Sequence, residues 1–429
     1  MNISSDTKGI DPFRAIEVSQ LAHELRAQGA SVIHMEFGQP SEGAPAGAIE
    51  AARGAMDGGD MGYWESMPLR QRIAKHYQDE YDVDVQPQQV LLTCGASPAL
   101  VLALLSAFDV GSRVMTARPG YVAYRNSLRA LHMNPVEIAC GEEDRFQINA
   151  RHIRDAADAP DGLIVASPAN PTGTIIPPAE LADIAAACRE RNVQIISDEI
   201  YHRLSYEIET QSMLTHDPES FIVNSFSKYY GMPGWRLGWL ICPQKFVAAA
   251  RARAGNLLLT PPALSQHAAL AAFDCTDELD KRVEVYRRNR TLLIETLAQL
   301  GITDIAPSDG AFYVYASIAH LTDDSLAFCK KLLAETGIAT APGLDFDPEH
   351  GRRFIRFSYA VTTEMAAEAC DRLTKWMPQQ AGYRAPGDKK IFMDEWGRSA
   401  DILAMQDLRD GFLAGVSEAR DCLAGMSAR

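Results

Sequence analysis

Short apolar runs alternate with longer stretches of helical periodicity through most of the chain. The runs are rich in β-branched residues, and they predict buried strands at residues 89–93, 113–117, 162–167, 193–198, 221–225 and 236–242. Strands that alternate with helices along a sequence usually lie parallel in one sheet. We therefore expect an α/β fold whose large domain has a mostly parallel central sheet flanked by helices.

The pattern changes beyond about residue 300, where "GAFYVYA", "GIATAPG" and "RFIRFSYA" are interrupted by two helical stretches. This pattern predicts a smaller α+β domain, and we expect an N-terminal helix, at about residues 12–29, to belong to it. After a turn-rich linker, apolar residues from Ile402 to Leu423 recur at roughly helical intervals and predict an amphipathic tail helix. The expected divisions are 1–40 (N-terminal arm and small-domain helix), 41–290 (large cofactor-binding domain), 291–378 (small domain) and 379–429 (linker and tail).

Composition narrows the classes of protein that the chain can belong to. The net charge is −15 with no basic block, so neither a nucleic acid nor an anionic membrane is an expected partner. Eight cysteines lie scattered without a C-x-x-C pair, so we expect neither a zinc site nor a disulfide framework. The N-terminus lacks a signal-peptide pattern and the longest apolar stretch is about half a membrane span, which favours the cytoplasm.

A turn with free backbone amides follows the first predicted strand. In "CGASPALVLALL", Ser97 is expected to cap a helix and Pro98 to begin it, which leaves the amides of Gly95, Ala96 and Ser97 unpaired. Helix N-termini bind phosphate, but an ordinary strand-to-helix turn explains this stretch equally well when it is taken alone.

Two further strand ends carry polar residues. Asn170 lies in the stiff loop "PANPTG", and Asp198 ends an apolar strand three residues before Tyr201. The loop alone is typical of a turn, and the aspartate of a helix cap. Beside a cationic ring nitrogen, the same carboxylate would keep that nitrogen protonated.

Lys228 follows the apolar strand 221–225 in "SFSKYYGMPGWRLGW". A lysine delivered into a buried site has a lowered pKa and becomes a nucleophile toward carbonyl groups, whereas most lone lysines are simply solvated. Ser225, Ser227 and Arg236 are available nearby to hold an anion. Because ligands of open parallel sheets bind at the carboxyl ends of the strands, these features are expected to form one site.

Four motifs in this order, "SPANPTG", "SDEIY", "SFSKYYGMPGWRLGW" and "FIRFSYA", carry a resemblance to a known family. From about residue 10 to 377 the chain resembles the class I/II aminotransferases of the fold-type I superfamily, the group that contains aspartate aminotransferase. The resemblance implies a homodimeric enzyme that uses pyridoxal 5′-phosphate.

The resemblance also implies roles for residues that would hold the cofactor ring. Lys228 matches the lysine that forms a Schiff base with the cofactor and moves the proton during the reaction, and Asp198 matches the partner of the ring nitrogen. Tyr201 and Asn170 match the residues that hydrogen-bond the ring's phenolic oxygen, and Tyr121 in "RPGYVAY" matches the aromatic that stacks on the ring.

Phosphate and substrate contacts follow from the same resemblance. Arg356 matches the arginine that grips the substrate α-carboxylate, with help from Gly38 and Asn170. Tyr63 lies where the family supplies a phosphate-binding tyrosine from the partner subunit, although the segment after it is shorter than usual. The glycines after Lys228 are expected to let the chain pass close to the phosphate. The expected phosphate ligands within the subunit are Gly95, Ala96, Ser97, Ser225, Ser227 and Arg236.

The expected reaction is transfer of the α-amino group of an L-amino acid to a 2-oxo acid. Ile10 and Phe13 lie in the segment that covers the substrate side chain in many relatives, which favours an apolar or aromatic amino acid. A dicarboxylic substrate would need a second cation, which Lys8 or Arg14 could supply. The alternatives are a lyase or oxidase that uses the same cofactor, and a non-catalytic cofactor-binding regulator.

Overall fold

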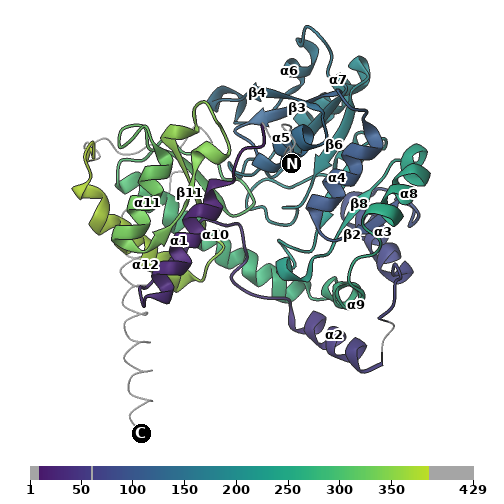
Figure 1. Cartoon of the computed structure of the whole chain (residues 1–429), viewed down its shortest axis with the longest axis horizontal. Coiled ribbons are helices and arrows are strands. Elements are labelled where there is room, and N and C mark those ends of the chain that lie inside the picture. The colour runs from purple at the N-terminus through teal and green to yellow at the C-terminus, as the bar shows by residue number, and fades with distance from the viewer. Residues whose placement is uncertain (1–8, 59–60, 386–429) are drawn as a thin grey trace, which may run out of the picture. The chain divides into compact units, whose positions relative to one another are not determined.

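A seven-stranded sheet forms the centre of the larger part of the structure (Figure 1). The structure is a computed structural model that describes residues 9–58 and 61–385, so the predicted tail helix lies outside the described residues. Only β8 runs antiparallel to its neighbours, and the other pairs are parallel. Across the sheet the order is β2 (Val90–Thr93), β8 (Gly238–Ile241), β7 (Phe221–Ser225), β6 (Gln194–Asp198), β5 (Gly162–Ala166), β3 (Arg113–Arg118) and β4 (Asn134–Ala139).

Helices cover both faces of this sheet. Successive residues of a strand point to opposite faces, so the apolar central strands have side chains to bury on each side. Ile164 and Ile196 enter one apolar core, whereas Leu163 and Ile195, their neighbours in sequence, enter the other. None of the helices in the described ranges is long and apolar enough to cross a membrane. The core that contains Ile164 includes α4 (Ala96–Ala107), α5 (Val122–Ala130) and α8 (Val247–Leu257). The core that contains Leu163 includes α3 (Met67–Tyr81), α6 (Ala150–Arg154), α7 (Pro178–Arg191), α9 (Ala263–Ala272) and α10 (Thr276–Gln299). The helix α2 (Ala46–Gly58) packs against α9.

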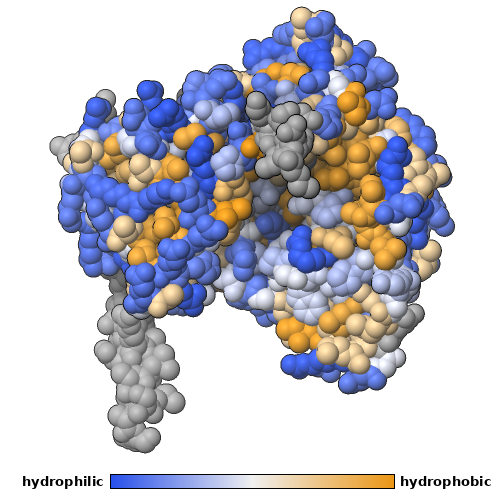
Figure 2. Space-filling model, in the orientation of Figure 1, coloured by the Kyte–Doolittle hydropathy of each residue, from blue (hydrophilic) through white to orange (hydrophobic). Residues whose placement is uncertain are grey.

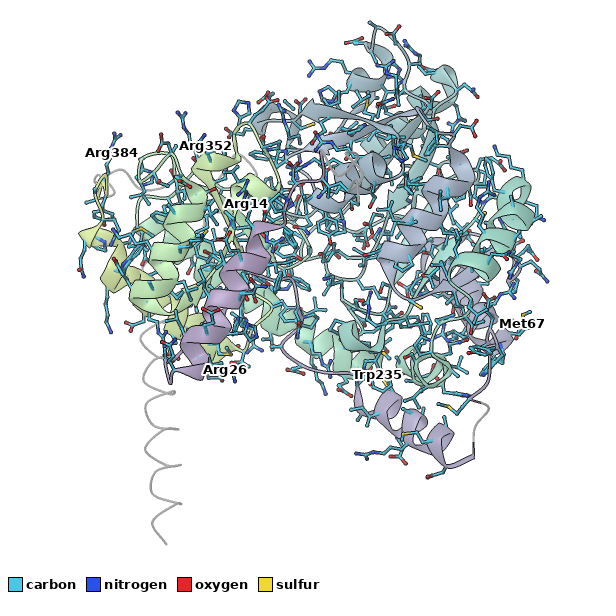
Figure 3. The ribbon with its side chains drawn as sticks, viewed as in Figure 1. Arg14, Arg26, Met67, Trp235, Arg352 and Arg384 are labelled. Carbon is cyan, nitrogen blue, oxygen red and sulfur yellow. The ribbon has the colours of Figure 1, made fainter. Side chains whose placement is uncertain are left out.

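A second group of elements surrounds two small sheets. One is antiparallel, in the order β11 (Ala341–Pro342), β12 (Phe354–Ser358) and β9 (Tyr313–Ser317), and the other pairs β1 (Ile33–His34) with β10 (Ile338–Ala339). The N-terminal helix α1 (Arg14–Ala27) contacts α11 (Ser325–Thr336) and the strands β10 and β11, and α12 (Thr363–Trp376) packs on α10. Figure 3 labels Arg14 and Arg26 near the two ends of α1. The boundaries expected at residues 40, 290 and 378 stay predictions, and α10 is continuous through residue 290.

The α/β fold with a mostly parallel central sheet is confirmed, and each of the six predicted strands is present. The seventh strand, β4, was not predicted because it lies at the edge of the sheet, half exposed, and carries Pro135 and Glu137. The helix α4 begins two residues earlier than predicted: Gly95 rather than Ser97 is the N-cap, and Ala96 rather than Pro98 is the first helical residue.

Candidate active site

Polar residues from five strands meet at one edge of the large sheet. Asp198 is the last residue of β6 and Ser225 the last of β7, while Asn170, Tyr121 and Gly95 follow β5, β3 and β2. These strands run in the same direction, so their carboxyl ends lie side by side. The structure therefore brings together the strand-end residues that the sequence predicted as one site.

The N-terminus of α4 and Arg236 form one end of this site. Gly95 has a φ of +102°, and a Cβ added to it would lie 2.5 Å from the Arg236 guanidinium. The backbone conformation thus favours glycine at residue 95, and the Arg236 guanidinium lies directly against it. The amides of Ala96 and Ser97, in the first turn of α4, have no acceptor within the helix and are available to an anion.

Two serine hydroxyls border the same place. The Oγ atoms of Ser225 and Ser227 lie 2.8 Å apart, and both side chains are buried. In the sheet register Gly238 pairs with Ser225 on one side and with Thr93 on the other, which brings the end of β7 next to the turn that leads into α4. A helix N-terminus, a guanidinium and two hydroxyls in one place are suited to bind a phosphate group.

Gly238, one of the three glycines after Lys228, borders the anion site, because a Cβ added to it would lie 2.8 Å from the backbone of Gly95. A Cβ added to Gly231 would lie 2.7 Å from the Gly43 carbonyl, and one added to Gly234 would meet no described heavy atom within 4 Å. That these glycines let the chain pass close to the phosphate stays a prediction.

Lys228 extends its amine toward the segment that joins the two groups of elements. The Nζ atom donates to the Gly38 carbonyl at 2.6 Å and lies 5.5 Å from the centre of the Tyr201 ring. Burial lowers the pKa of Lys228 to about 8; the charge of Arg356 adds to the decrease and that of Asp198 opposes it. A much larger fraction of this amine is therefore unprotonated at neutral pH than for a solvated lysine.

Asp198 is buried but has a hydrogen-bond donor on each carboxylate oxygen. The Tyr124 hydroxyl donates to Oδ2 at 2.6 Å, and the Ile200 amide donates to Oδ1 at 3.1 Å. Burial raises the pKa of Asp198, and these two hydrogen bonds oppose the increase. Tyr124 was not identified from the sequence, although its spacing of three residues from Tyr121 is that of neighbours on a helix.

Tyr201 forms a hydroxyl pair with Tyr313, a residue that the sequence analysis also missed. The two hydroxyl oxygens are 2.7 Å apart, and both side chains are buried. A Cβ added to Gly38 would lie 1.6 Å from the Tyr313 hydroxyl, so only glycine fits at residue 38. Tyr313 is the first residue of β9, so it connects Tyr201 and Gly38 to the small antiparallel sheet.

Arg356 is 1% exposed, and its guanidinium lies between aromatic rings. Its Cζ is 4.4 Å from the centre of the Tyr313 ring and 4.6 Å from that of Phe346. One nitrogen donates to Asn170 Oδ1 at 2.7 Å, another donates to the Glu36 carbonyl, and Nε has no hydrogen-bond partner in the described part of the chain. None of the ion pairs between described residues includes Arg356, so this buried cation has donors left for an anionic ligand.

Tyr121 lies among the charged groups of the site. Burial raises its pKa, the charge of Asp198 raises it further, and the charges of Arg356 and Arg236 lower it. Its ring meets that of Tyr124 edge-on, with centroids 5.5 Å apart. Tyr121 therefore lies close enough to Asp198, Arg356 and Arg236 for their charges to act on its hydroxyl.

Tyr63 is the one predicted site residue that the structure does not connect to the others. Its side chain is 86% exposed. None of the hydrogen bonds, ion pairs or ring contacts within residues 9–58 and 61–385 joins it to another predicted site residue. A contribution from Tyr63 would require a second subunit.

The remaining residues fit the cofactor that the resemblance implies. Pyridoxal 5′-phosphate has a phosphate, an aldehyde and a ring nitrogen, and the site offers an anion-binding turn, a lysine with a lowered pKa and a buried carboxylate. The carboxylate and the amine lie close enough for their charges to interact. The donor set therefore matches the chemistry of all three groups.

Comparison with known proteins agrees with this arrangement. Residues 31–373 match the sequence model of the family "aminotransferase class I and II". The chain is 44% identical over 379 residues to a valine–pyruvate aminotransferase of Mycobacterium tuberculosis, a match that covers 87% of this chain and 98% of the relative. It is 31% identical over 366 residues to an aspartate aminotransferase of Sulfurisphaera tokodaii, covering 82% of this chain and 91% of that protein.

Solved structures share the fold. A crystal structure of an aminotransferase from Mycobacterium tuberculosis superposes with a TM-score of 0.86 at 43% identity, and the match covers 89% of this chain and all of that one. Aspartate aminotransferase from Thermus thermophilus with maleate gives a TM-score of 0.82 at 30% identity, covering 87% of this chain and 99% of that one.

Proposed function

Since the chain belongs to the class I and II aminotransferases and is a pyridoxal 5′-phosphate-dependent aminotransferase, we propose that it transfers the amino group of an apolar L-amino acid, with valine as the first candidate, to pyruvate. The single observation that supports this substrate class is the apolar cluster of Phe346, Phe13 and Phe37 beside Arg356. The name of the 44% identical relative supports the choice of valine and pyruvate.

We propose that the strand-end residues hold the cofactor. The bound cofactor supplies an aldehyde that accepts the amino group and a ring that withdraws electrons from the substrate Cα. Lys228, whose pKa is lowered to about 8, would attach the cofactor and then move a proton from the substrate Cα. Asp198 would hold the proton on the ring nitrogen, and Tyr201 and Asn170 would contact the phenolic oxygen. The ring would stack on Tyr121.

The phosphate is assigned to the anion site at the start of α4. Arg236 supplies charge, and the amides at the N-terminus of α4 supply donors without acceptors of their own. The Ser225 hydroxyl donates to the Leu237 carbonyl at 2.9 Å and lies 2.8 Å from that of Ser227, and we propose that the two hydroxyls turn to the phosphate when it binds. The phosphate ligands in this proposal are Gly95, Ala96, Ser97, Ser225, Ser227 and Arg236.

Arg356 is assigned to the substrate α-carboxylate. A planar guanidinium binds a carboxylate through two parallel hydrogen bonds, and Asn170 and the Glu36 carbonyl hold this one in place. Gly38 leaves room beside it, since a side chain there would collide with Tyr313. The carboxylate would complete the hydrogen bonding of a buried cation that has no ion-pair partner among the described residues.

Apolar rings beside Arg356 favour an apolar substrate side chain. Phe346 faces the guanidinium, and Phe13 and Phe37 pack against the same cluster with their ring centroids 6.1 Å apart. A dicarboxylic substrate would need a second cation here. Arg14, the first residue of α1, is the candidate: its backbone amide donates to Asp345 at 2.8 Å. The proposed preference for valine therefore predicts poor turnover of aspartate.

The active unit is proposed to be a homodimer that works in the cytoplasm. Large apolar side chains are exposed on α2 and on the segments near it, and Figure 2 shows apolar residues gathered over α2. Met67, labelled in Figure 3, is the first residue of α3. A second copy covering this surface would bury it and would bring Tyr63 to a neighbouring site. The exposed large apolar residues on α2 and in the segment that leads from it into α3 are Ile49, Met56, Met61, Tyr63 and Met67.

Two measurements test the proposal. Initial rates with valine, phenylalanine, alanine and aspartate, each with pyruvate and with 2-oxoglutarate, should give the highest kcat/KM for valine with pyruvate. A preference for aspartate would refute the substrate assignment. Light scattering should give the mass of two chains, and a monomer with full activity would refute the dimer.

A further inference from the structure

The second hydrogen-bond layer behind Asp198 contains a tyrosine that neither the motifs nor the comparisons assign. Tyr124 lies on α5, three residues after Tyr121, and its hydroxyl donates to Asp198 Oδ2 at 2.6 Å. The other oxygen, Oδ1, accepts from the Ile200 amide at 3.1 Å. Tyr124 thus supplies the only side-chain hydrogen bond to Asp198 among the described residues.

This hydrogen bond favours the ionised form of a carboxyl group that burial otherwise disfavours. Short O–H···O⁻ bonds are charge-assisted and stronger than those between neutral groups. Of the interactions that keep the pKa of Asp198 from rising further, the bond from Tyr124 is the largest. The pKa of Tyr124 itself lies well above its ordinary value, chiefly through burial, so the phenol stays a donor at any working pH.

The position of Tyr124 also fixes the direction of the carboxylate. With one donor on each oxygen, Asp198 has restricted rotation about its terminal bond. The Tyr124 ring is buried in the core that includes Leu128, and it meets Tyr121 edge-on. The same short helix therefore supports both the residue proposed to stack on the ring and the residue behind the carboxylate.

We propose that Tyr124 is a positioning residue of the reaction, which acts through Asp198 by holding its carboxylate ionised and directed at the cofactor's ring nitrogen. The inference rests on the role proposed for Asp198. Tyr124 touches neither the substrate nor the reacting atoms in this assignment. Its contribution should therefore depend on the presence of a nitrogen in the ring.

Tyr124→Phe isolates the hydroxyl, because phenylalanine keeps the ring that packs in the core. The matched control is Tyr206→Phe, since the Tyr206 hydroxyl is also buried and donates to the Ala311 carbonyl at 2.6 Å, away from Asp198. Dissociation constants are measured for two ligands of the apoprotein: pyridoxal 5′-phosphate and its 1-deaza analogue, in which a C–H group replaces the ring nitrogen.

Wild-type protein should bind the cofactor more tightly than the analogue. Tyr124→Phe should weaken cofactor binding by about tenfold, the usual effect of losing a hydrogen bond to a charged group, and should change analogue binding by less than about twofold. Tyr206→Phe should leave the ratio of the two constants unchanged. In the holoenzyme, Tyr124→Phe should lower kcat while KM for the amino acid stays within about threefold.

Each outcome separates one claim from another. If wild-type protein binds both ligands equally well, the role proposed for Asp198 is wrong. If wild-type protein discriminates and Tyr124→Phe discriminates to the same extent, the inference about Tyr124 is overturned. An equal loss of affinity for both ligands would show a merely structural role and would also overturn it. In an Asp198→Asn background, Tyr124→Phe should have no further effect on the ratio, because the ionised carboxylate through which Tyr124 is proposed to act is absent; a further change of the ratio there would also overturn the inference.

Discussion

Replacing Arg356 by lysine separates substrate capture from cofactor binding. Lysine keeps the positive charge but loses the planar fork, so it cannot form two parallel hydrogen bonds to a carboxylate. It also cannot reproduce the bonds that Arg356 donates to Asn170 and the Glu36 carbonyl, or its stacking between Tyr313 and Phe346. The cofactor-binding residues at the strand ends are left unchanged.

The size of the effect follows from the burial of Arg356. Its guanidinium is 1% exposed and has no anionic partner among the described residues, so a bound carboxylate would interact with it in a site shielded from water. Losing one partner of a buried, hydrogen-bonded charge pair costs on the order of 2 to 5 kcal/mol. This corresponds to a loss of roughly 30-fold to several thousand-fold in kcat/KM.

Single-turnover rates with valine, phenylalanine and aspartate measure this effect. The α-carboxylate is common to all three, so the loss should be similar for each, while the absorption spectrum of the bound cofactor stays nearly that of wild type. Arg70→Lys is the matched control, because Arg70 is also a buried arginine but binds the Pro87 carbonyl outside the site. A loss confined to one amino acid, or a loss of the same size in Arg70→Lys, would refute the assignment.

Three further predictions concern the cofactor. Lys228→Ala should abolish the pH-sensitive absorption band of the purified protein, and a wild-type protein that stays colourless with pyridoxal 5′-phosphate would contradict the role of Lys228. The pKa of Lys228 is lowered to about 8, so the rate at which an aldehyde modifies this lysine in the apoprotein should rise with pH and level off above about 8. If the midpoint of this pH–rate curve lay near the ordinary pKa of 10.5, the amine would not be desolvated. Asp198→Asn should keep the cofactor bound but lower turnover by about a hundredfold or more, since a neutral amide cannot hold the ring nitrogen protonated, and turnover within about threefold of wild type would assign that task to another residue.

The sequence was sufficient for features that depend on local pattern. Asp198 ends an apolar strand, and Lys228 and Asn170 come within four residues of the ends of two others. Neighbouring parallel strands bring their carboxyl ends to the same edge of the sheet, so the meeting of these residues could be predicted from their order along the chain. The buried position of Arg356 in an apolar strand was likewise apparent from "FIRFSYA". The edge strand β4 was not predicted, because an edge position tolerates proline and charged residues and its sequence therefore lacks an apolar run.

Contacts between distant segments could not be predicted in this way. Tyr313 meets Tyr201 across more than a hundred residues, and the approach of Arg236 to Gly95 depends on how two turns pack. Such contacts are set by tertiary packing, on which the hydrophobic periodicity of one segment carries no information. The role proposed for Tyr63 depends in the same way on contacts between distant segments, in this case on those of the proposed second subunit.

The central claim is that the protein transfers an amino group from valine to pyruvate with the aid of Lys228. The direct test is product analysis with stoichiometric purified holoenzyme. Adding valine alone should release one equivalent of its 2-oxo acid per active site and no ammonia, and subsequent addition of pyruvate should yield one equivalent of alanine. Release of ammonia without an oxo-acid co-substrate, or no reaction of valine under conditions where aspartate reacts, would contradict the account.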